Sequence, residues 1–127
     1  MSDKTIIEKL SVKPRARFLL VNPPTGYIEG LGKLPQGAVL LSDSSCQVEA
    51  IQVFVANRAE LEDILPRLKE LLAAKGMLWV TYHKGSSIVK TDINRDTINA
   101  YAQTLGMQGV AMISINDDWS ALRLKLI

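Results

Sequence analysis

The sequence has 127 residues, 47% of them apolar and 22% charged, which is enough for one domain (residues 1–127) with a buried core and excludes a disordered chain. Its 15 Lys and Arg against 13 Asp and Glu give a net charge of +2, too small to indicate nucleic-acid binding, while one cysteine and one histidine argue against disulfides and zinc sites. No apolar run approaches the roughly 18 residues of a membrane span, and the N-terminus has no signal-peptide hydrophobic region, so a cytoplasmic protein is expected.

The first third of the chain predicts two helices and two strands. Ser2 or Asp3 would cap the first helix, whose apolar residues recur at helical spacing, and Pro14 ends it. The first strand is a short apolar run that stops at Asn22-Pro23-Pro24. The first helix carries Ile6, Ile7 and Leu10 as its apolar stripe, and the strand, brief helix and second strand that follow cover residues 17–21, 26–31 and 38–41.

The clearest helix follows a third predicted strand at residues 48–55. Asn57 is a good N-cap with Glu60 three residues later, and Gly76 stands where a C-cap glycine is expected. Pro66 predicts a kink or a break inside this helix, because proline removes one helical hydrogen bond. The helix has one continuous apolar face, formed by Leu61, Ile64, Leu65, Leu68, Leu71 and Leu72.

The second half of the chain predicts another strand and another helix. Residues 77–82 alternate little between apolar and polar, as expected of a strand that is covered on both faces. The helix after it begins at Asp92 or Asn94 and closes at Gly106. Its apolar residues are Ile98, Tyr101, Ala102 and Leu105.

The last predicted unit is an antiparallel hairpin formed by residues 110–115 and 122–126. The second of these strands alternates, which points Arg123 and Lys125 to solvent. With the strands and helices before it, the hairpin predicts a three-layer α/β sandwich with a mostly parallel, Rossmann-like sheet. Only about six residues join the second and third strands, whereas a parallel crossover normally takes a dozen or more.

The helix, turn and strand in the middle of the chain resemble a unit of class I methyltransferases. In that unit a helix ends in a proline- or lysine-glycine turn that feeds a central strand, as residues 64–72 and 75–80 do here. The terminal hairpin is also similar, because one strand of that fold inserts antiparallel. The resemblance implies a Rossmann-like fold and S-adenosylmethionine as the cofactor.

Most of the chain also resembles a family of bacterial proteins known as the domain of unknown function 3052 family. That family has no established activity, so the resemblance implies a fold and no mechanism. The residues that carry it are Leu19 to Tyr27, Leu78-Trp79-Val80 with Lys84, Lys90-Thr91-Asp92, and Asp118-Trp119-Ser120 with Leu122.

The sequence departs from working methyltransferases in the half that would hold the cofactor. Their glycine-rich turn after the first strand is replaced by Asn22-Pro23-Pro24-Thr25-Gly26, in which two residues have no N–H. The acidic residue that they carry after the second strand has only Asp43 as a counterpart. The short link between the second and third strands predicts either that a helix and a strand are missing or that the second strand runs in another direction. We therefore expect a trimmed relative of the fold, with no cofactor assigned and S-adenosylmethionine kept as an alternative.

Two groups of residues have the types needed for catalysis without the required pattern. Asn22-Pro23-Pro24 is similar to the Asn-Pro-Pro-aromatic motif of amino-group methyltransferases, but the aromatic residue, Tyr27, comes two residues late, which favours a rigid turn. His83, Ser86-Ser87 and Asp92 include the residue types of a nucleophilic triad, but no Gly-x-Ser-x-Gly elbow is present. His83 is instead expected at a strand end, at the edge of the sheet.

A loop after the fourth strand predicts an anion site. Lys84-Gly85-Ser86-Ser87, with Lys90, follows a central strand at its carboxyl end, where open α/β sheets bind ligands. Gly85 would let backbone N–H groups turn inward, the hydroxyls can donate hydrogen bonds, and the lysines supply charge. Asn57-Arg58 would face the same edge, unless they serve only as a helix cap and a surface residue.

The sequence thus predicts a non-catalytic or degenerate methyltransferase-like domain that binds a small anionic ligand or a protein partner. The first alternative is an S-adenosylmethionine-dependent small-molecule transferase. The second is a structural or regulatory homodimer, because a missing helix would expose an apolar face of the sheet. No catalytic or metal-binding residue is assigned, and neither membrane nor nucleic-acid binding is expected. The candidate ligand-binding residues are Asn22, Tyr27, Asn57, Arg58, His83, Lys84, Ser86, Ser87, Lys90 and Asp92.

Overall fold

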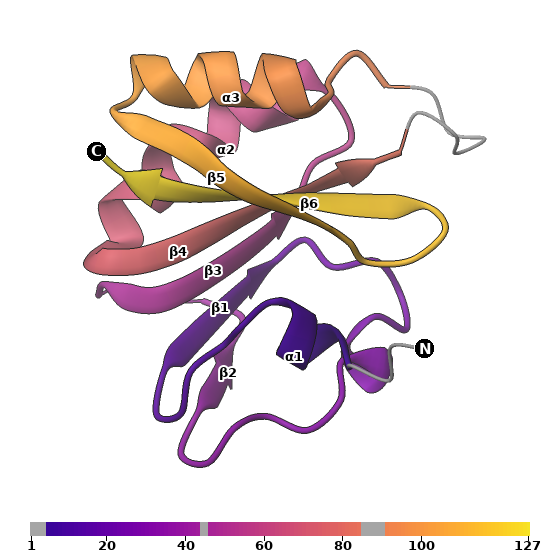
Figure 1. Cartoon of the computed structure of the whole chain (residues 1–127), viewed down its shortest axis with the longest axis vertical. Helices are drawn as coiled ribbons and strands as arrows, with labels where there is room; N and C mark the ends of the chain where they lie inside the picture. The colour runs from indigo at the N-terminus through magenta and orange to yellow at the C-terminus, as the bar shows by residue number, and fades with distance from the viewer. Residues whose placement is uncertain (1–4, 44–45, 85–90) are drawn as a thin grey trace.

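A computed structural model describes residues 5–43, 46–84 and 91–127 of the chain (Figure 1). Its strands are β1 (Arg17–Val21), β2 (Val39–Leu41), β3 (Val48–Phe54), β4 (Leu72–His83), β5 (Met107–Ser114) and β6 (Trp119–Leu126). Its helices are α1 (Ile6–Lys9), the 3-10 helix η1 (Ile28–Gly30), α2 (Arg58–Leu71) and α3 (Arg95–Thr104). None of these described helices is both long enough and apolar enough to cross a membrane.

The strands form one six-stranded sheet in the order β2-β1-β3-β4-β6-β5. The first four in this order are parallel, and β6 is antiparallel to both β4 and β5. This mostly parallel sheet with an antiparallel hairpin at one side confirms the topology that the sequence predicts.

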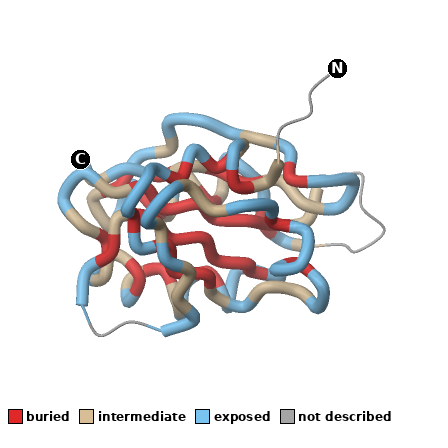
Figure 2. Tube along the Cα trace, turned by 90° about the horizontal axis from the view of Figure 1, so that it is seen from below, coloured by how far each residue is buried: buried red, intermediate tan, exposed pale blue. Residues whose placement is uncertain are grey.

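Helices cover both faces of the sheet and complete the predicted three layers. α2 and α3 lie together at the top of Figure 1, away from α1, and pack on one face, whereas α1 and the segment around η1 pack on the other. Alternate residues of β4 serve both faces: Val80 packs with α2 and α3, and the indole N–H of Trp79 donates to the Leu10 carbonyl at 3.0 Å. The buried segments are concentrated in the central layer (Figure 2).

The cap of α1 differs from the prediction. α1 begins after Thr5 rather than after Ser2 or Asp3, both of which lie outside the described residues. The Thr5 hydroxyl accepts from the Glu8 N–H at 3.2 Å, and the Glu8 carboxylate accepts from the Thr5 N–H at 2.9 Å. This reciprocal pair satisfies two backbone donors at the start of the helix.

The junction between α2 and β4 also differs from the prediction. α2 ends at Leu71 and β4 begins at Leu72, so Gly76 is not a helix cap but lies inside the strand. The pairing of β3 with β4 is irregular at this point, and a Cβ atom on Gly76 would lie 2.9 Å from the carbonyl oxygen of Glu49. The glycine is therefore required because two backbones approach closely.

α2 is continuous through Pro66, so the predicted break does not occur, whereas the alternative of a kink stays a prediction. Proline has no N–H to donate to the carbonyl of Glu62, four residues earlier. That carbonyl accepts instead from the hydroxyl of Tyr101 in α3, at 3.3 Å. The contact satisfies the freed acceptor and links the two helices. α3 itself is capped by Asn94, one of its two predicted caps.

The short link between β2 and β3 spans strands that all run in the same direction. β2 pairs in parallel with one side of β1, and β3 pairs in parallel with the other side. β2 and β3 therefore lie on opposite sides of β1, and all three strands are parallel. In the described part of the chain no helix stands between β2 and β3, as the sequence predicts for a trimmed fold.

The terminal hairpin is longer than the sequence predicts. β5 begins at Met107 and β6 at Trp119, so Trp119 belongs to a strand and packs against the core on the α1 face. β5 forms one edge of the sheet and leaves Val110 and Met112 43% and 47% exposed. These exposed apolar side chains belong to an edge strand, and the homodimer stays a prediction.

Candidate functional site

The carboxyl ends of β1 and β3 and the start of β6 meet at the edge where the sequence predicts the ligand site. Asn22 directly follows β1 and adopts a left-handed backbone conformation with a φ of 57°. Two prolines follow it, so the turn is rigid. A cavity of about 420 Å³ lies here, lined by Asn22, Phe54, Val55, Ala56, Glu60 and Trp119.

A row of aromatic rings forms one wall of this edge. Phe54, at the end of β3, meets Tyr27 and Trp119 in edge-to-face contacts with ring centroids 4.6 and 4.9 Å apart. His83, at the end of β4, stacks on Trp119 with centroids 3.9 Å apart. His83 Nδ1 is buried, and no described residue forms a hydrogen bond with it. The predicted strand-end position of His83 is correct, and stacking holds its ring there.

Tyr27 belongs to the core and does not line the cavity. Its side chain is buried, and its hydroxyl donates to the Gln52 Oε1 at 2.9 Å, while the Gln52 Nε2 donates to the Thr81 Oγ1 at 3.0 Å. Burial raises the pKa of Tyr27 to about 12, so the phenol stays neutral and keeps its proton for this bond. The three residues form a buried polar chain that joins β3 and β4 to the segment after β1.

Three further candidate residues form hydrogen bonds at the start of α2. The Asn57 side chain accepts from the Glu60 N–H at 2.9 Å, which confirms the predicted N-cap. The Asp92 carboxylate accepts from the Arg58 N–H at 2.7 Å, and the Arg58 guanidinium pairs with Glu62 at 2.8 Å. Asp92 therefore places a negative charge at the N-terminus of α2, where it stabilises the helix by interacting with the helix dipole.

Lys84 is bonded to the terminal hairpin. Its backbone N–H donates to the Asp118 carbonyl at 2.8 Å, and its ammonium donates to the Ser114 hydroxyl at 2.6 Å. The remaining candidates, Ser86, Ser87 and Lys90, lie outside the described residues. The anion loop of which they are part stays a prediction.

The carboxyl-edge cavity offers hydrogen-bond acceptors rather than positive charge. Its polar side chains are Asn22 and Glu60, and one carboxylate oxygen of Glu60 accepts from the Ala56 N–H at 2.9 Å. A carboxylate repels an anion at short range. The cavity therefore suits a neutral or positively charged group.

The residues at this edge do not fit S-adenosylmethionine in the way that the resemblance to methyltransferases implies. A glycine-rich turn would bring backbone N–H groups toward the cofactor, whereas Pro23 and Pro24 have none. Asp43, the counterpart of the ribose-binding acidic residue, lies beyond the end of β2 and is exposed.

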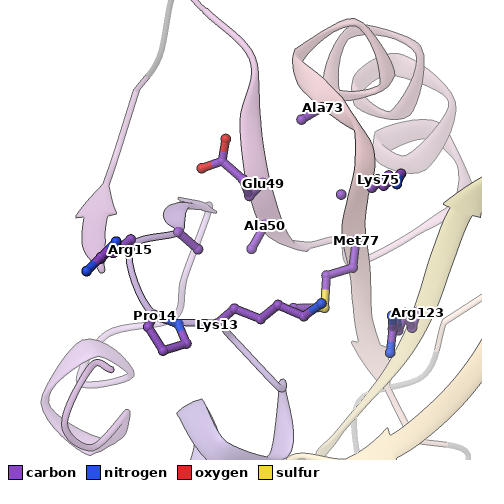
Figure 3. A pocket seen from close by; sticks show the side chains of 11 residues that line it. Lys13, Pro14, Arg15, Glu49, Ala50, Ala73, Lys75, Met77 and Arg123 are labelled. Atoms are coloured by element: carbon purple, nitrogen blue, oxygen red, sulfur yellow. The ribbon is translucent and has the colours of Figure 1, made fainter. Parts of the chain in front are cut away.

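A second cavity, of about 260 Å³, lies at the opposite edge, where the amino ends of β1, β3 and β4 meet (Figure 3). The buried side chains of Ala50 and Met77 form part of its apolar wall. In Figure 3 the Lys13 side chain points toward Met77, and the Glu49 carboxylate points away from it. The charged residues of the lining are Lys13, Arg15, Glu49, Lys75 and Arg123.

No sequence pattern indicates this amino-edge cavity, because its lining comes from four separate segments. Arg123 shows this most clearly, since alternation in β6 predicts that it faces solvent. Arg123 pairs with Trp79 of β4 and points to the α1 face, where its Nε is buried. The neighbouring alternate residue, Ala121, is apolar and fully buried, and that was the available signal that this face is partly covered.

Comparisons with known proteins give matches in structure but not in sequence. No protein-family model matches the chain, and no curated protein matches it. A ribosomal protein L11 methylase from Lactobacillus delbrueckii subsp. bulgaricus aligns with a TM-score of 0.62 and 14% identity, over 94% of this chain and 74% of that one. LepI in complex with SAM aligns with a TM-score of 0.49 and 16% identity, over 94% of this chain and 38% of that one.

The first of these likenesses is clear in structure and low in identity, so it shows the fold and not the activity. Together with the strand order, it identifies the domain as an α/β domain with a truncated class I methyltransferase-like fold. We draw no conclusion from the weaker likeness.

Proposed function

We propose that this chain is a methyltransferase-like domain that binds a small anionic ligand and does not transfer methyl groups. The turn after β1 carries the proposal, because Asn22 in a left-handed conformation and two prolines stand where the fold family has glycines. The prolines cannot donate backbone hydrogen bonds to a cofactor. Membership of the domain of unknown function 3052 family, which the motifs of the chain resemble, is part of this proposal.

The candidate side chains at the carboxyl edge support the absence of methyl transfer, because they are bonded within the protein. Tyr27 donates to Gln52, and Asp92 accepts from the backbone of α2. Lys84 donates to the hairpin. Groups that satisfy one another in this way contribute to stability, and a ligand would have to compete for them.

A transferase that uses S-adenosylmethionine is the second candidate. The observation that favours it is the open cavity beside Asn22, Glu60 and Trp119, at the edge where open α/β sheets bind ligands. The Glu60 carboxylate would attract the positive charge of that cofactor.

Thermal unfolding with and without S-adenosylmethionine distinguishes the two candidates. A ligand at a hundred times its dissociation constant stabilises a protein by about 2.7 kcal/mol, which raises the unfolding midpoint by several degrees. We expect no rise at a cofactor concentration of about 1 mM. The control is Trp119→Ala, which removes one of the two aromatic rings that line the carboxyl-edge cavity. A rise in the wild type that this variant abolishes would overturn the proposal in favour of the transferase.

A further inference from the structure

We propose that the amino-edge cavity binds a small organic anion, in which a phosphate or carboxylate group is attached to a short apolar body. The inference names the site and the ligand class for the binding role proposed above, and it rests on that role. Ligands of open α/β sheets usually bind at the carboxyl ends of the strands, so the fold does not assign a ligand to this edge.

Positive charge is in surplus around this cavity. Its one carboxylate, Glu49, accepts from the Arg17 side chain at 2.6 Å and from the Arg17 backbone N–H at 2.8 Å, so it is already neutralised. Four cationic side chains line the cavity, and none of them has an ion-pair partner among the described residues: Lys13, Arg15, Lys75 and Arg123. A bound anion would offset this positive charge.

Arg123 provides an independent observation. Its side chain lies on the α1 face of the sheet, since residues that pair across two strands share a face and Trp79 is its partner. The Nε atom is buried, and no described residue accepts a hydrogen bond from it. A buried donor without an acceptor destabilises a protein, and a guanidinium group matches the geometry of phosphate and carboxylate. Because the Nε atom is closed to solvent, an anionic oxygen would bind the outer nitrogens of this guanidinium, and Arg123 is part of the cavity lining.

The wall beside these cations is apolar and includes Ala50 and Met77. Ala50 is 0% and Met77 7% exposed, so the wall is part of the hydrophobic core. Gly76 cannot be replaced by a larger residue that would fill the space, because its Cβ would collide with the Glu49 carbonyl. At about 260 Å³ the cavity is smaller than the pockets that hold drug-sized ligands. A compact ligand with one anionic group and a few carbon atoms suits both the wall and the charges.

The turn that supplies Lys13 and Arg15 is held in an unusual conformation. Arg15 has a φ of 65°, which is uncommon for a residue with a side chain. Its N–H donates to the Gln36 carbonyl at 2.9 Å, and the Ala16 N–H donates to the Lys13 carbonyl at 3.2 Å. Backbone outliers that are held in this way are concentrated at ligand sites.

Calorimetric titration of the whole chain with four probes tests the ligand class. Inorganic phosphate carries only the charge, benzyl alcohol carries only the apolar body, and phenyl phosphate and benzoate carry both. We expect phenyl phosphate to bind more tightly than inorganic phosphate, and benzyl alcohol not to bind. Comparing benzoate with phenyl phosphate tells which anionic group the cavity prefers. If no anion binds at about 10 mM, the inference and the ligand-binding part of the proposed function are both wrong.

Charge-removing variants test the place of binding. We expect Arg123→Gln and Lys13→Gln each to lower the affinity for phenyl phosphate by about tenfold or more. Lys125→Gln removes the same charge from an exposed position of β6 outside the cavity and should leave the affinity unchanged. Lys13 lies in a loop, so its variant keeps the test valid if Arg123→Gln fails to fold. Phenyl phosphate binding that is equal in all three variants would overturn this inference and leave the proposed function standing.

Discussion

The polar side chains at the two ends of the parallel strands differ in whether they are bonded within the protein. At the carboxyl end, Tyr27, Asp92 and Lys84 form hydrogen bonds within the protein, and aromatic rings fill the wall. At the amino end, a group of cations lies around an apolar cavity without ion-pair partners in the described part of the chain. Open α/β sheets bind their ligands at the carboxyl edge. In this chain, the cations without ion-pair partners point to the amino edge as the place where an anion would bind.

The largest expected effect is at the amino end, in Gly76→Ala. The new Cβ would meet Leu72 Cδ1 at 2.7 Å and the carbonyl oxygens of Glu49 and Ala73 at 2.9 and 3.0 Å. We expect this overpacking to lower the free energy of unfolding by about 2–3 kcal/mol in urea denaturation. The control is Gly30→Ala, where a Cβ would have no atom within 4 Å. Equal stabilities of the two variants would show that the wall of the amino-edge cavity can move.

Removing one hydroxyl at the carboxyl end tests whether its hydrogen bonds are structural. Tyr27→Phe leaves the Gln52 oxygen buried without its donor, so we expect a loss of about 1–2 kcal/mol in the free energy of unfolding. Tyr101→Phe is the matched change at a more exposed hydroxyl, where water can replace the lost bond to Glu62, and it should cost less. If Tyr27→Phe were neutral, the carboxyl end would hold a hydroxyl free to act on a ligand.

The charge of Asp92 should have a smaller effect. Asp92→Asn keeps an acceptor for the Arg58 N–H but removes the negative charge at the start of α2. We expect a loss of about 0.3–1 kcal/mol at low ionic strength that shrinks in high salt, because the interaction with the helix dipole is screened. Asp117→Asn, in the hairpin turn, serves as the control. A loss that is independent of salt would point to a steric cause instead.

The smallest expected effect is the pH dependence from Glu49. Hydrogen bonds from the Arg17 side chain, and then from its backbone, lower the pKa of Glu49 from 4.5 to about 2. A lowered carboxyl pKa stabilises the fold above about pH 4.5, and this contribution is lost as the pH falls toward 2. Both side chains are more than 40% exposed, so solvent screening reduces the contribution to a few tenths of a kcal/mol, roughly.

Urea denaturation between pH 2 and 6 measures this contribution as the difference between the wild type and Glu49→Gln. The difference should be present at the upper end of the range and absent at the lower end. Arg17→Gln removes the partner and should abolish the same dependence. A difference that is constant with pH would mean that Glu49 is not paired in solution, and the positive surplus at the amino end would then be smaller than we describe.

The sequence predicts the helices and strands best where a local pattern is compatible with only one structure. The apolar run bounded by Asn22-Pro23-Pro24 is β1, and Asn57 caps α2 as expected. Gly76 was misassigned, because a glycine is required both at helix ends and where backbones approach, and only the packing of β3 distinguishes the two. Pro66 does not break α2, and the hydroxyl that satisfies the freed carbonyl belongs to another helix, which no local pattern reports.

The candidate site was predictable in position but not in the roles of its residues. Parallel strands bring their carboxyl ends to one edge, so the edge followed from the strand order alone. The role of Tyr27 depends on Gln52, 25 residues away in the chain, and no local pattern reports such a pairing. The amino-edge cavity is lined by four segments that are far apart in the chain, and the sequence does not show that they come together.

The place of β6 in the sheet determines which strand edge stays unpaired while the chain is being synthesised. β6 lies between β4 and β5, although it follows both of them in the chain. A ribosome adds about 5–20 residues per second, so β4 waits for several seconds, roughly, with one hydrogen-bonding edge unpaired. That edge belongs to an apolar central strand that includes Leu78, Trp79 and Val80. During translation, a chaperone or a neighbouring nascent chain would therefore meet an open sheet edge before the finished domain exists.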